Sequence, residues 1–267
     1  MFCLAALIPS PPILVPELCG DSASERPCTA RTQQDEQVAE LRTAAVTAGR
    51  ALAAETMRWT VVGVAAADQR LGPEVVGTFR GYGVDYLVAL SGSAGNGAEG
   101  PVTVADPRLP LPALIGAWLR GETAQGAEAE AWLIAAEAST DRCAELGAKL
   151  RAELESDDEP RGVLVVADGA ATLSTSAPGY FDPRAEDVQG RLDRALADGD
   201  RAALLELEPD LCAELALSGR AAYQMLAGLF AADPDDPVID TVYQGAPFGV
   251  GYQVGLWRPG AQGGDRR

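Results

Sequence analysis

The chain lacks histidine altogether, since none of its 267 residues carries an imidazole. Without that group the chain cannot supply a Ser-His-Asp triad, a Cys-His pair or an H-E-x-x-H zinc motif from its own residues. A metal site built only from carboxylates would suit magnesium or calcium, but no two acidic residues stand at a characteristic ligand spacing. Histidine-based hydrolase and metalloprotease chemistry is therefore excluded.

Basic residues are scarce, with 21 Lys and Arg against 39 Asp and Glu and a formal net charge of −18. A surface with this balance repels nucleic-acid phosphates and anionic lipid headgroups. We therefore expect neither nucleic acid nor a membrane as a partner. Solubility accounts for the acid excess, because no D-x-D-x-D-G calcium loop is present.

Long hydrophobic runs are also missing, although 47% of the residues are hydrophobic. The apolar runs have the length of a strand and are broken by Pro, Gly or charge, so none predicts a membrane span. Residues 1–8 lack the basic start and the cleavage site of a secretory signal and are better explained as a buried strand. The five cysteines contain no C-x-x-C pair, which favours free thiols and a cytoplasmic location.

What the sequence does contain is an alternation of short β-branched runs with longer Ala/Leu/Glu/Arg stretches. This alternation predicts an α/β fold with a central, mostly parallel sheet flanked by helices on both faces. We expect one domain over residues 1–257 and a flexible tail over 258–267. The predicted strands are Phe2–Ile8, Thr60–Ala65, Tyr86–Leu90, Ala131–Ala136, Val163–Ala167, Val238–Tyr243 and Gly249–Leu256.

Helical periodicity is clear in four stretches, where apolar residues recur every three or four positions. The predicted helices are Gln33–Glu55, Asp141–Glu155, Arg184–Ala197 and Gly219–Ala231. Thr140 or Asp141 is the expected N-cap of the second, and Asp182 with Pro183 the expected start of the third. The Gly-rich segment Ser91–Gly100 is expected to be a mobile loop without a phosphate-binding motif.

Polar residues that follow the predicted strands mark the candidate site. Ligands of open parallel sheets bind beyond the carboxyl ends of the strands, where this sequence places Ser10, Asp68 and Asp168, and Asp106 stands before a further expected helix. One hydroxyl and three carboxylates would serve acid/base chemistry if burial raised the pKa of one carboxylate. The competing interpretation is that each Asp is a helix cap or turn residue.

Three stretches in the first third carry the motifs of a known family. Residues 8–18, IPSPPILVPEL, are similar to V-P-H-P-P-L-x-x-P-E-[IL], with Ser10 at the histidine. Residues 61–68, VVGVAAAD, are similar to a strand ending in S-P-H, which puts the second lost histidine within Ala65–Ala67. Residues 77–83, GTFRGYG, resemble the G-D-F-x-x-F-G that follows it. These motifs resemble those of the catalytic chains of the class III extradiol ring-cleavage dioxygenase superfamily, in particular its Memo-like branch.

The later stretches continue the resemblance in the same order. Residues 105–112, ADPRLPLP, are similar to L-D-H-G-x-x-V-P, keep Asp106 and have Pro107 at the histidine. Residues 166–173, VADGAATL, are similar to S-G-D-L-S-H-R-L, keep Asp168 and have Ala171 at the histidine. Residues 173–183, LSTSAPGYFDP, resemble L-T-x-D-A-P-x-G-Y-D-P, and residues 244–252, QGAPFGVGY, resemble E-x-P-F-G-V-G-Y, with Gln244 at the acid. The resemblance spans nearly the whole chain.

The resemblance implies the fold and a cleft but not the oxygen chemistry of the family. Its dioxygenases hold ferrous iron with two histidines and a carboxylate, and the Ser, Ala, Pro and Ala found here are not iron ligands. We therefore expect no metal and no other cofactor. The resemblance and the strand ends together predict a ligand-binding cleft framed by Ser10, Asp68, Asp106, Asp168, Gln244 and Tyr252.

Three functions compete on this basis. The leading one is a degenerate, iron-free relative of the dioxygenases whose cleft binds a small molecule or whose surface recruits a protein. A second is a metal-independent hydrolase or isomerase with Asp68 or Asp168 as general base and Ser10 or a tyrosine as proton donor. A third is a dioxygenase whose iron ligands come from a partner subunit. The identity of the ligand, any remaining catalysis and homo-oligomer formation stay open.

Overall fold

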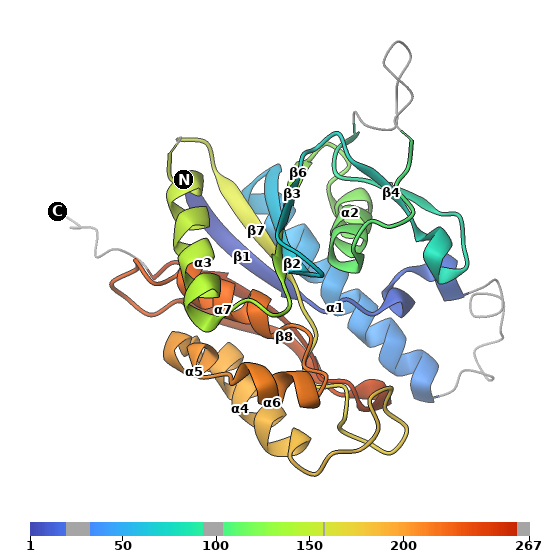
Figure 1. Cartoon of the computed structure of the whole chain (residues 1–267). Coiled ribbons are helices and arrows are strands. Elements are labelled where there is room, and N and C mark those ends of the chain that lie inside the picture. The colour runs from blue at the N-terminus through green and yellow to red at the C-terminus, as the bar shows by residue number, and fades with distance from the viewer. Residues whose placement is uncertain (20–32, 93–103, 157, 261–267) are drawn as a thin grey trace.

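A sheet of seven strands runs through the centre of the molecule, in the order β3-β6-β2-β7-β1-β9-β8 (Figure 1). The structure is a computed structural model and describes residues 1–19, 33–92, 104–156 and 158–260. The strands of the sheet are β1 Phe2–Ile8, β2 Arg58–Ala65, β3 Gln69–Leu71, β6 Glu128–Ala135, β7 Arg161–Val166, β8 Val238–Gly245 and β9 Tyr252–Arg258. The neighbours β6, β2, β7 and β1 pair in parallel, whereas β3 and β9 pair antiparallel with their neighbours. The predicted α/β class with a mostly parallel sheet is confirmed.

Helices cover both faces of this sheet. Their bounds are α1 Gln33–Glu55, α2 Leu111–Thr123, α3 Thr140–Leu154, α4 Ala185–Asp198, α5 Arg201–Leu205, α6 Pro209–Glu214 and α7 Arg220–Leu229. None of the helices in the described residues is long and apolar enough to cross a membrane.

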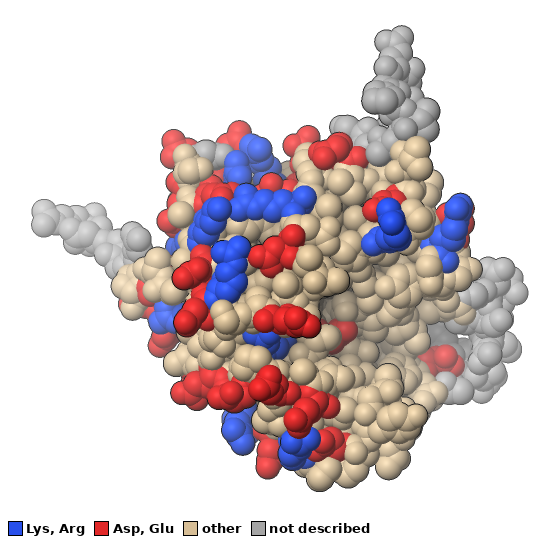
Figure 2. Space-filling view, in the orientation of Figure 1, with Lys and Arg blue, Asp and Glu red and all other residues tan. Residues whose placement is uncertain are grey.

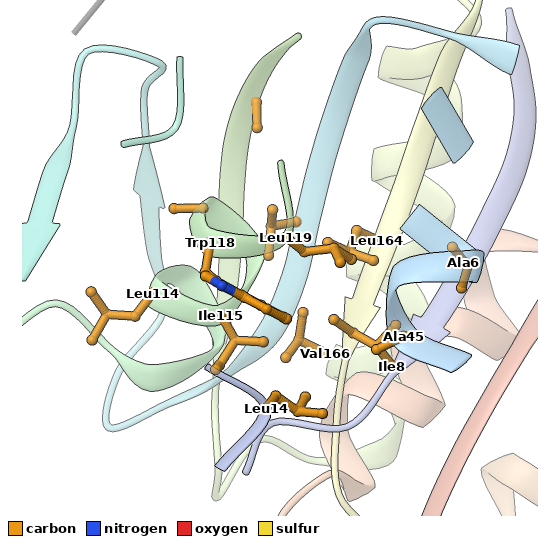
Figure 3. Packing of buried hydrophobic residues seen from close by; sticks show 14 of the residues in the cluster. Ala6, Ile8, Leu14, Ala45, Leu114, Ile115, Trp118, Leu119, Leu164 and Val166 are labelled. Carbon is orange, nitrogen blue, oxygen red and sulfur yellow. The ribbon is translucent and has the colours of Figure 1, made fainter. Parts of the chain in front are cut away.

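Strand β1 shows why both faces need cover. Successive side chains of a strand point to opposite faces of the sheet. Leu4, Ala6 and Ile8 therefore pack in the core beneath α1 and α2, while Ala5 and Leu7 pack in the core beneath α4, α5 and α7. In Figure 3, Ala6 and Ile8 lie with Leu164 and Val166 of β7 against side chains of α1 and α2.

The predicted bounds are most accurate for the first strand and for the helix with the longest periodic pattern. The predicted ranges for β1 and α1 agree with the structure residue for residue. The prediction that Tyr86–Leu90 belongs to the central sheet is wrong: β5 (Leu87–Ala89) pairs with β4 (Val76–Thr78) in a separate sheet of two strands. The predicted strand Gly249–Leu256 begins only at Tyr252, because a 3₁₀ turn occupies Pro247–Gly249.

The N-cap of α3 is also corrected. Ser139, one residue before the predicted Thr140, caps the helix, because its hydroxyl accepts the backbone N–H of Arg142. Of the Gly-rich segment Ser91–Gly100, all but the first two residues lie outside the described residues, as do residues 261–267 of the predicted tail.

Helices α3 and α7 cross at a contact between their backbones. A Cβ added to Gly147 of α3 would lie 2.1 Å from the carbonyl oxygen of Met225. A Cβ added to Gly228 of α7 would lie 2.3 Å from the carbonyl oxygen of Ala144. Both distances are far inside van der Waals contact, so only glycine lets the two helices approach this closely.

We expect Gly147→Ala to lower the free energy of unfolding by about 1–3 kcal/mol, the usual cost of inserting a methyl group into a filled space. The matched control is Gly121→Ala in α2, where an added Cβ meets nothing within 4 Å. That change should raise stability by about 0.5–1 kcal/mol, because alanine loses less backbone freedom on folding. Urea unfolding of both variants measures the difference, and equal effects would contradict the proposed helix contact.

Candidate functional site

Ser10 and Asp168 meet at the carboxyl ends of two neighbouring strands. Strands β1 and β7 are parallel, with Ile8 opposite Val166, so the residues that follow each strand emerge side by side. The backbone N–H of Ser10 donates to Oδ1 of Asp168 at 2.6 Å, and the Ser10 hydroxyl donates to Oδ2 at 2.6 Å. Both oxygens of one carboxylate are therefore held by one residue from the far end of the chain.

The environment of Asp168 disfavours its charge. Desolvation by the surrounding protein raises the pKa of this carboxyl, and the two hydrogen bonds from Ser10 oppose that rise. The residue still keeps some exposed surface. A carboxylate that is poorly hydrated yet reachable is typical of binding and catalytic sites.

Two tyrosines lie close to this carboxylate. Burial, followed by the charge of Asp168, raises the pKa of both Tyr223 and Tyr252. The Tyr223 hydroxyl donates to the carbonyl oxygen of Ala167 at 2.9 Å. Tyr252 is 5% exposed, and its hydroxyl makes no hydrogen bond to any described residue. Tyr252 therefore offers an uncommitted donor beside Asp168.

A polar network connects the loop after β7 to α4 and β8. The backbone N–H of Ala170 donates to Oε1 of Gln189 at 2.8 Å, and Nε2 of Gln189 donates to Asp193 at 2.7 Å. Gln244 completes the network by donating to the other oxygen of Asp193 at 3.1 Å. Desolvation raises the pKa of Asp193, while the two amide donors lower it. Gln244 thus supports the loop through Asp193.

The backbone of Gly251 forms two hydrogen bonds with the loop after β7, which comprises residues 167–184. Its carbonyl oxygen accepts from Gly169 at 2.8 Å and its N–H donates to Ala170 at 2.9 Å. A Cβ at this position would lie 2.3 Å from Cδ of Gln189. The close approach explains why a glycine precedes Tyr252.

Backbone strain gathers around the loop after β7. The non-glycine residues with positive φ in the described part of the chain are Tyr180 at 64°, Ala216 at 50° and Phe248 at 66°. Each lies in or next to a segment that hydrogen-bonds within the loop or to it: Gly179 and Leu215 bond to Ala171, and Gly249 bonds to Leu173. Strained residues cluster at functional sites because the surrounding structure must enforce them.

The surface of the molecule is hollowed near the loops after β7 (Figure 2). Figure 2 shows a depression between the α2 and β4 side of the molecule and the loops after β7, and most of its border carries no charge. Tyr180 and Phe181, in one of these loops, are 79% and 55% exposed. The site therefore combines a carboxylate with an uncharged and partly aromatic surrounding.

Asp68 and Asp106 lie apart from this cluster. Asp68 accepts from the backbone N–H of Ala135 at 2.8 Å and from Arg142 at 3.1 Å, and these two donors lower its pKa. Asp106 accepts from the backbone N–H of Arg108 at 2.8 Å, and its backbone forms an isolated parallel bridge with Gly77 of β4. Within the described residues, no hydrogen bond or ion pair links either carboxylate to Ser10 or Asp168.

The positions that the resemblance aligns with histidines do not form another metal site. Ala65 ends β2 and Ala66 and Ala67 follow it, on the other side of β7 from Ser10. Pro107 is exposed, and Ala171 packs partly against the core. Among the described residues there is no group of three or more His, Cys, Asp or Glu arranged to hold a metal ion. The donor set that remains near Ser10 is one carboxylate, hydroxyls and backbone groups.

Comparisons with known proteins leave the family open. No family model matches the chain, and no curated protein matches it. Among solved structures, an uncharacterized protein from Escherichia coli K12 is similar at 13% sequence identity with a TM-score of 0.48. The match covers 95% of this chain and 99% of that one.

Sequence reasoning did not find Tyr223, Gln189 and Asp193. One signal was available for two of them, since Gln189 and Asp193 stand four residues apart and so share one face of α4. Their connection to the loop after β7 depends on how α4 packs.

The raised pKa of Asp168 predicts a pH dependence of stability. The folded protein holds the Asp168 proton more tightly than the unfolded chain, so unfolding becomes easier as pH rises from the ordinary carboxyl pKa through the raised one. In Asp168→Asn, the Ser10 N–H can donate to the amide oxygen and the amide N–H to the Ser10 hydroxyl. We expect the stability of this variant relative to the parent to increase with pH across that window.

Urea unfolding between pH 4 and pH 8 measures the free energy of unfolding of the parent and of Asp168→Asn. The contributions of the other carboxyl groups are the same in both proteins and cancel in the difference. The matched control is Asp187→Asn, which removes an exposed carboxylate of α4, and the pH trend of Asp168→Asn should differ from the trend of this control. A relative stability of Asp168→Asn that falls with rising pH would contradict the assigned environment.

Proposed function

We propose that this chain is an iron-free relative of the extradiol dioxygenases that uses the hollow beside Asp168 to bind a small molecule. The observation that carries the proposal is the double hydrogen bond from Ser10 to Asp168. By the resemblance, Ser10 stands where the family has its first iron-binding histidine. Here that position holds a carboxylate through two hydrogen bonds and provides no ligand for iron.

The remaining groups favour a neutral ligand that carries hydroxyl groups. The Asp168 carboxylate offers acceptor lone pairs and repels anions, while the Tyr252 hydroxyl can donate or accept. Arg184, a nearby cation on the loop after β7, is occupied by Asp182 at 2.7 Å and Glu214 at 2.7 Å. Tyr180 and Phe181, exposed in the loop after β7, add aromatic surface to this end of the sheet.

Catechol is a suitable probe, because it joins two neutral hydroxyls to an aromatic ring. We expect metal-free protein to bind catechol in a saturable 1:1 manner by calorimetry under nitrogen. Asp168→Ala should weaken binding by about tenfold, the effect of one hydrogen bond to a charged group. Added iron(II) and oxygen should produce no ring cleavage and no oxygen uptake above that of a control without protein.

Asp187→Ala is the control for this experiment, because it removes one exposed carboxylate of α4 without touching the hollow. It should bind catechol like the parent. Equal binding by the parent and Asp168→Ala, or stoichiometric cleavage of catechol with iron(II), would refute the proposal.

Restoring the lost ligands tests the resemblance itself. Strands β1 and β2 both flank β7, so their carboxyl ends lie two strand spacings apart, roughly 10 Å. Two imidazoles at these ends, Ser10→His with one of Ala65→His, Ala66→His or Ala67→His, would flank the carboxylate of Asp168. At least one double variant should bind iron(II) about tenfold more tightly than the parent or than Ser10→His alone.

Calorimetry on the folded variants gives the answer for binding, which is all the proposal requires. If no double variant gains affinity over the single variant, then the alignment of Ser10 and Ala65–Ala67 with the family ligands is wrong.

The hydrolase or isomerase hypothesis rests on one specific observation. The Ser10 hydroxyl directs its proton at a carboxylate whose pKa is raised by desolvation, which is the arrangement of a nucleophile with its base. Asp68 is a poor base by comparison, because its pKa is lowered. Turnover of an ester or lactone that is lost in both Ser10→Ala and Asp168→Asn would favour this second function.

A further inference from the structure

We propose a second ligand site, for a small organic monoanion with an apolar body, in a cavity of about 320 Å³ between β3, β6 and α3. This volume lies near the lower end of the range for small-molecule pockets, which begins at about 300 Å³. The cavity includes Asp68 but neither Ser10 nor Asp168, so it is separate from the hollow beside Asp168.

The inner wall of the cavity is apolar. Trp132 and Ile134 of β6 are 4% and 1% exposed, and Met225 of α7 is 2% exposed. Leu146 of α3 is half-buried and completes this wall. The apolar part of a ligand bound here would move out of water and onto buried apolar side chains, which is a favourable transfer.

The rim of the cavity is cationic, in a chain whose net charge is −18. Arg70, Arg142 and Lys149 contribute three of the lining side chains, against one carboxylate from Asp68. Figure 2 shows Lys and Arg side chains among Asp and Glu side chains on the α3 side of the molecule, and Figure 1 shows β3 and β6 to the right of α3.

Two of the three cations already have partners. Arg70 forms a bidentate pair with Glu153 at 3.2 and 3.1 Å, and Arg142 pairs with Asp68 at 3.1 Å. Lys149 makes no hydrogen bond or ion pair with any described residue. The surplus is therefore one positive charge, which matches a monoanion.

Lys149 lies on the same helix face as two other residues that line the cavity. Arg142, Leu146 and Lys149 are spaced i, i+4 and i+7, so they share the face of α3 that borders the cavity. The guanidinium of Arg70 lies 3.3 Å from the centre of the Trp132 ring. This cation–π contact keeps the Arg70 side chain against the ring. A carboxylate at Lys149 would thus place its apolar part against Leu146, Trp132 and Met225.

Benzoate titrated into the full chain tests the proposal, with benzyl alcohol as the neutral molecule of similar shape. Calorimetry at constant ionic strength should show 1:1 binding of benzoate and binding of benzyl alcohol weaker by about tenfold. Tryptophan fluorescence should change on benzoate binding, and Trp132→Phe should remove that change, because the other tryptophans, Trp59, Trp118 and Trp257, are 2%, 2% and 1% exposed outside the cavity.

Matched variants locate the site. Lys149→Ala should weaken benzoate binding by about tenfold. Arg50→Ala, which removes one exposed positive charge from α1 on the other face of the sheet, should change it by about twofold or less. Leu146→Trp fills the cavity and should abolish binding in a protein whose circular dichroism is unchanged.

Two outcomes would overturn the proposal. One is equal weakening by Lys149→Ala and Arg50→Ala, which would show general charge attraction. The other is benzoate binding that survives Leu146→Trp or equals that of benzyl alcohol. Asp168→Asn should leave benzoate binding unchanged, so failure at one site is distinguishable from failure at the other.

Discussion

The parallel pairing of β1 with β7 organises this molecule. It joins the first strand to one that begins some 160 positions later, and Ala5, Ala6, Leu7 and Ile8 each stand opposite a residue of β7. Because both strands lie inside the sheet, their side chains are buried on both faces, and the helix layers on each side depend on this pairing. The same register brings Ser10 to Asp168, so the core and the candidate site have one structural origin.

The pairing of β1 with β7 also has an electrostatic cost. The fold places a carboxylate where desolvation opposes its charge, and Ser10 offsets the cost with two hydrogen bonds. Strained backbone at Tyr180, Ala216 and Phe248 surrounds the same loop. A fold selected only for stability would have little reason to keep both features together, which is why we propose a binding function for this end of the sheet.

The two proposed sites differ in the charge that they select. The hollow beside Asp168 has a partly buried carboxylate and a phenol, and the carboxylate disfavours anions. The cavity along α3 has a surplus positive charge at Lys149 above an apolar wall, and it favours anions. Arg142 of α3 also binds Asp68 at the end of β2, so the rim of the second site is anchored to the same edge of the sheet.

The sequence by itself determined that a buried central sheet forms and that the chain has no imidazole chemistry of its own. The uninterrupted apolar run of Phe2–Ile8 required burial on both faces, and the long period of Gln33–Glu55 was enough to place α1. The absence of histidine excluded imidazole ligands from this chain without any structure. Local pattern also placed Ser10 and Asp168 at one edge of the sheet, because residues after adjacent parallel strands lie there together.

Only the tertiary structure decided which of the polar residues lie together. Asp68 follows a predicted strand as Asp168 does, and Asp106 precedes an expected helix. Backbone N–H groups and arginines bind both carboxylates away from Asp168. Leu87–Ala89 has strand composition but too few residues to specify its partner, and it pairs with β4 outside the main sheet. The Lys149 cavity likewise depends on how α3 packs over β3 and β6, and such contacts between distant segments leave no periodic signal in the sequence.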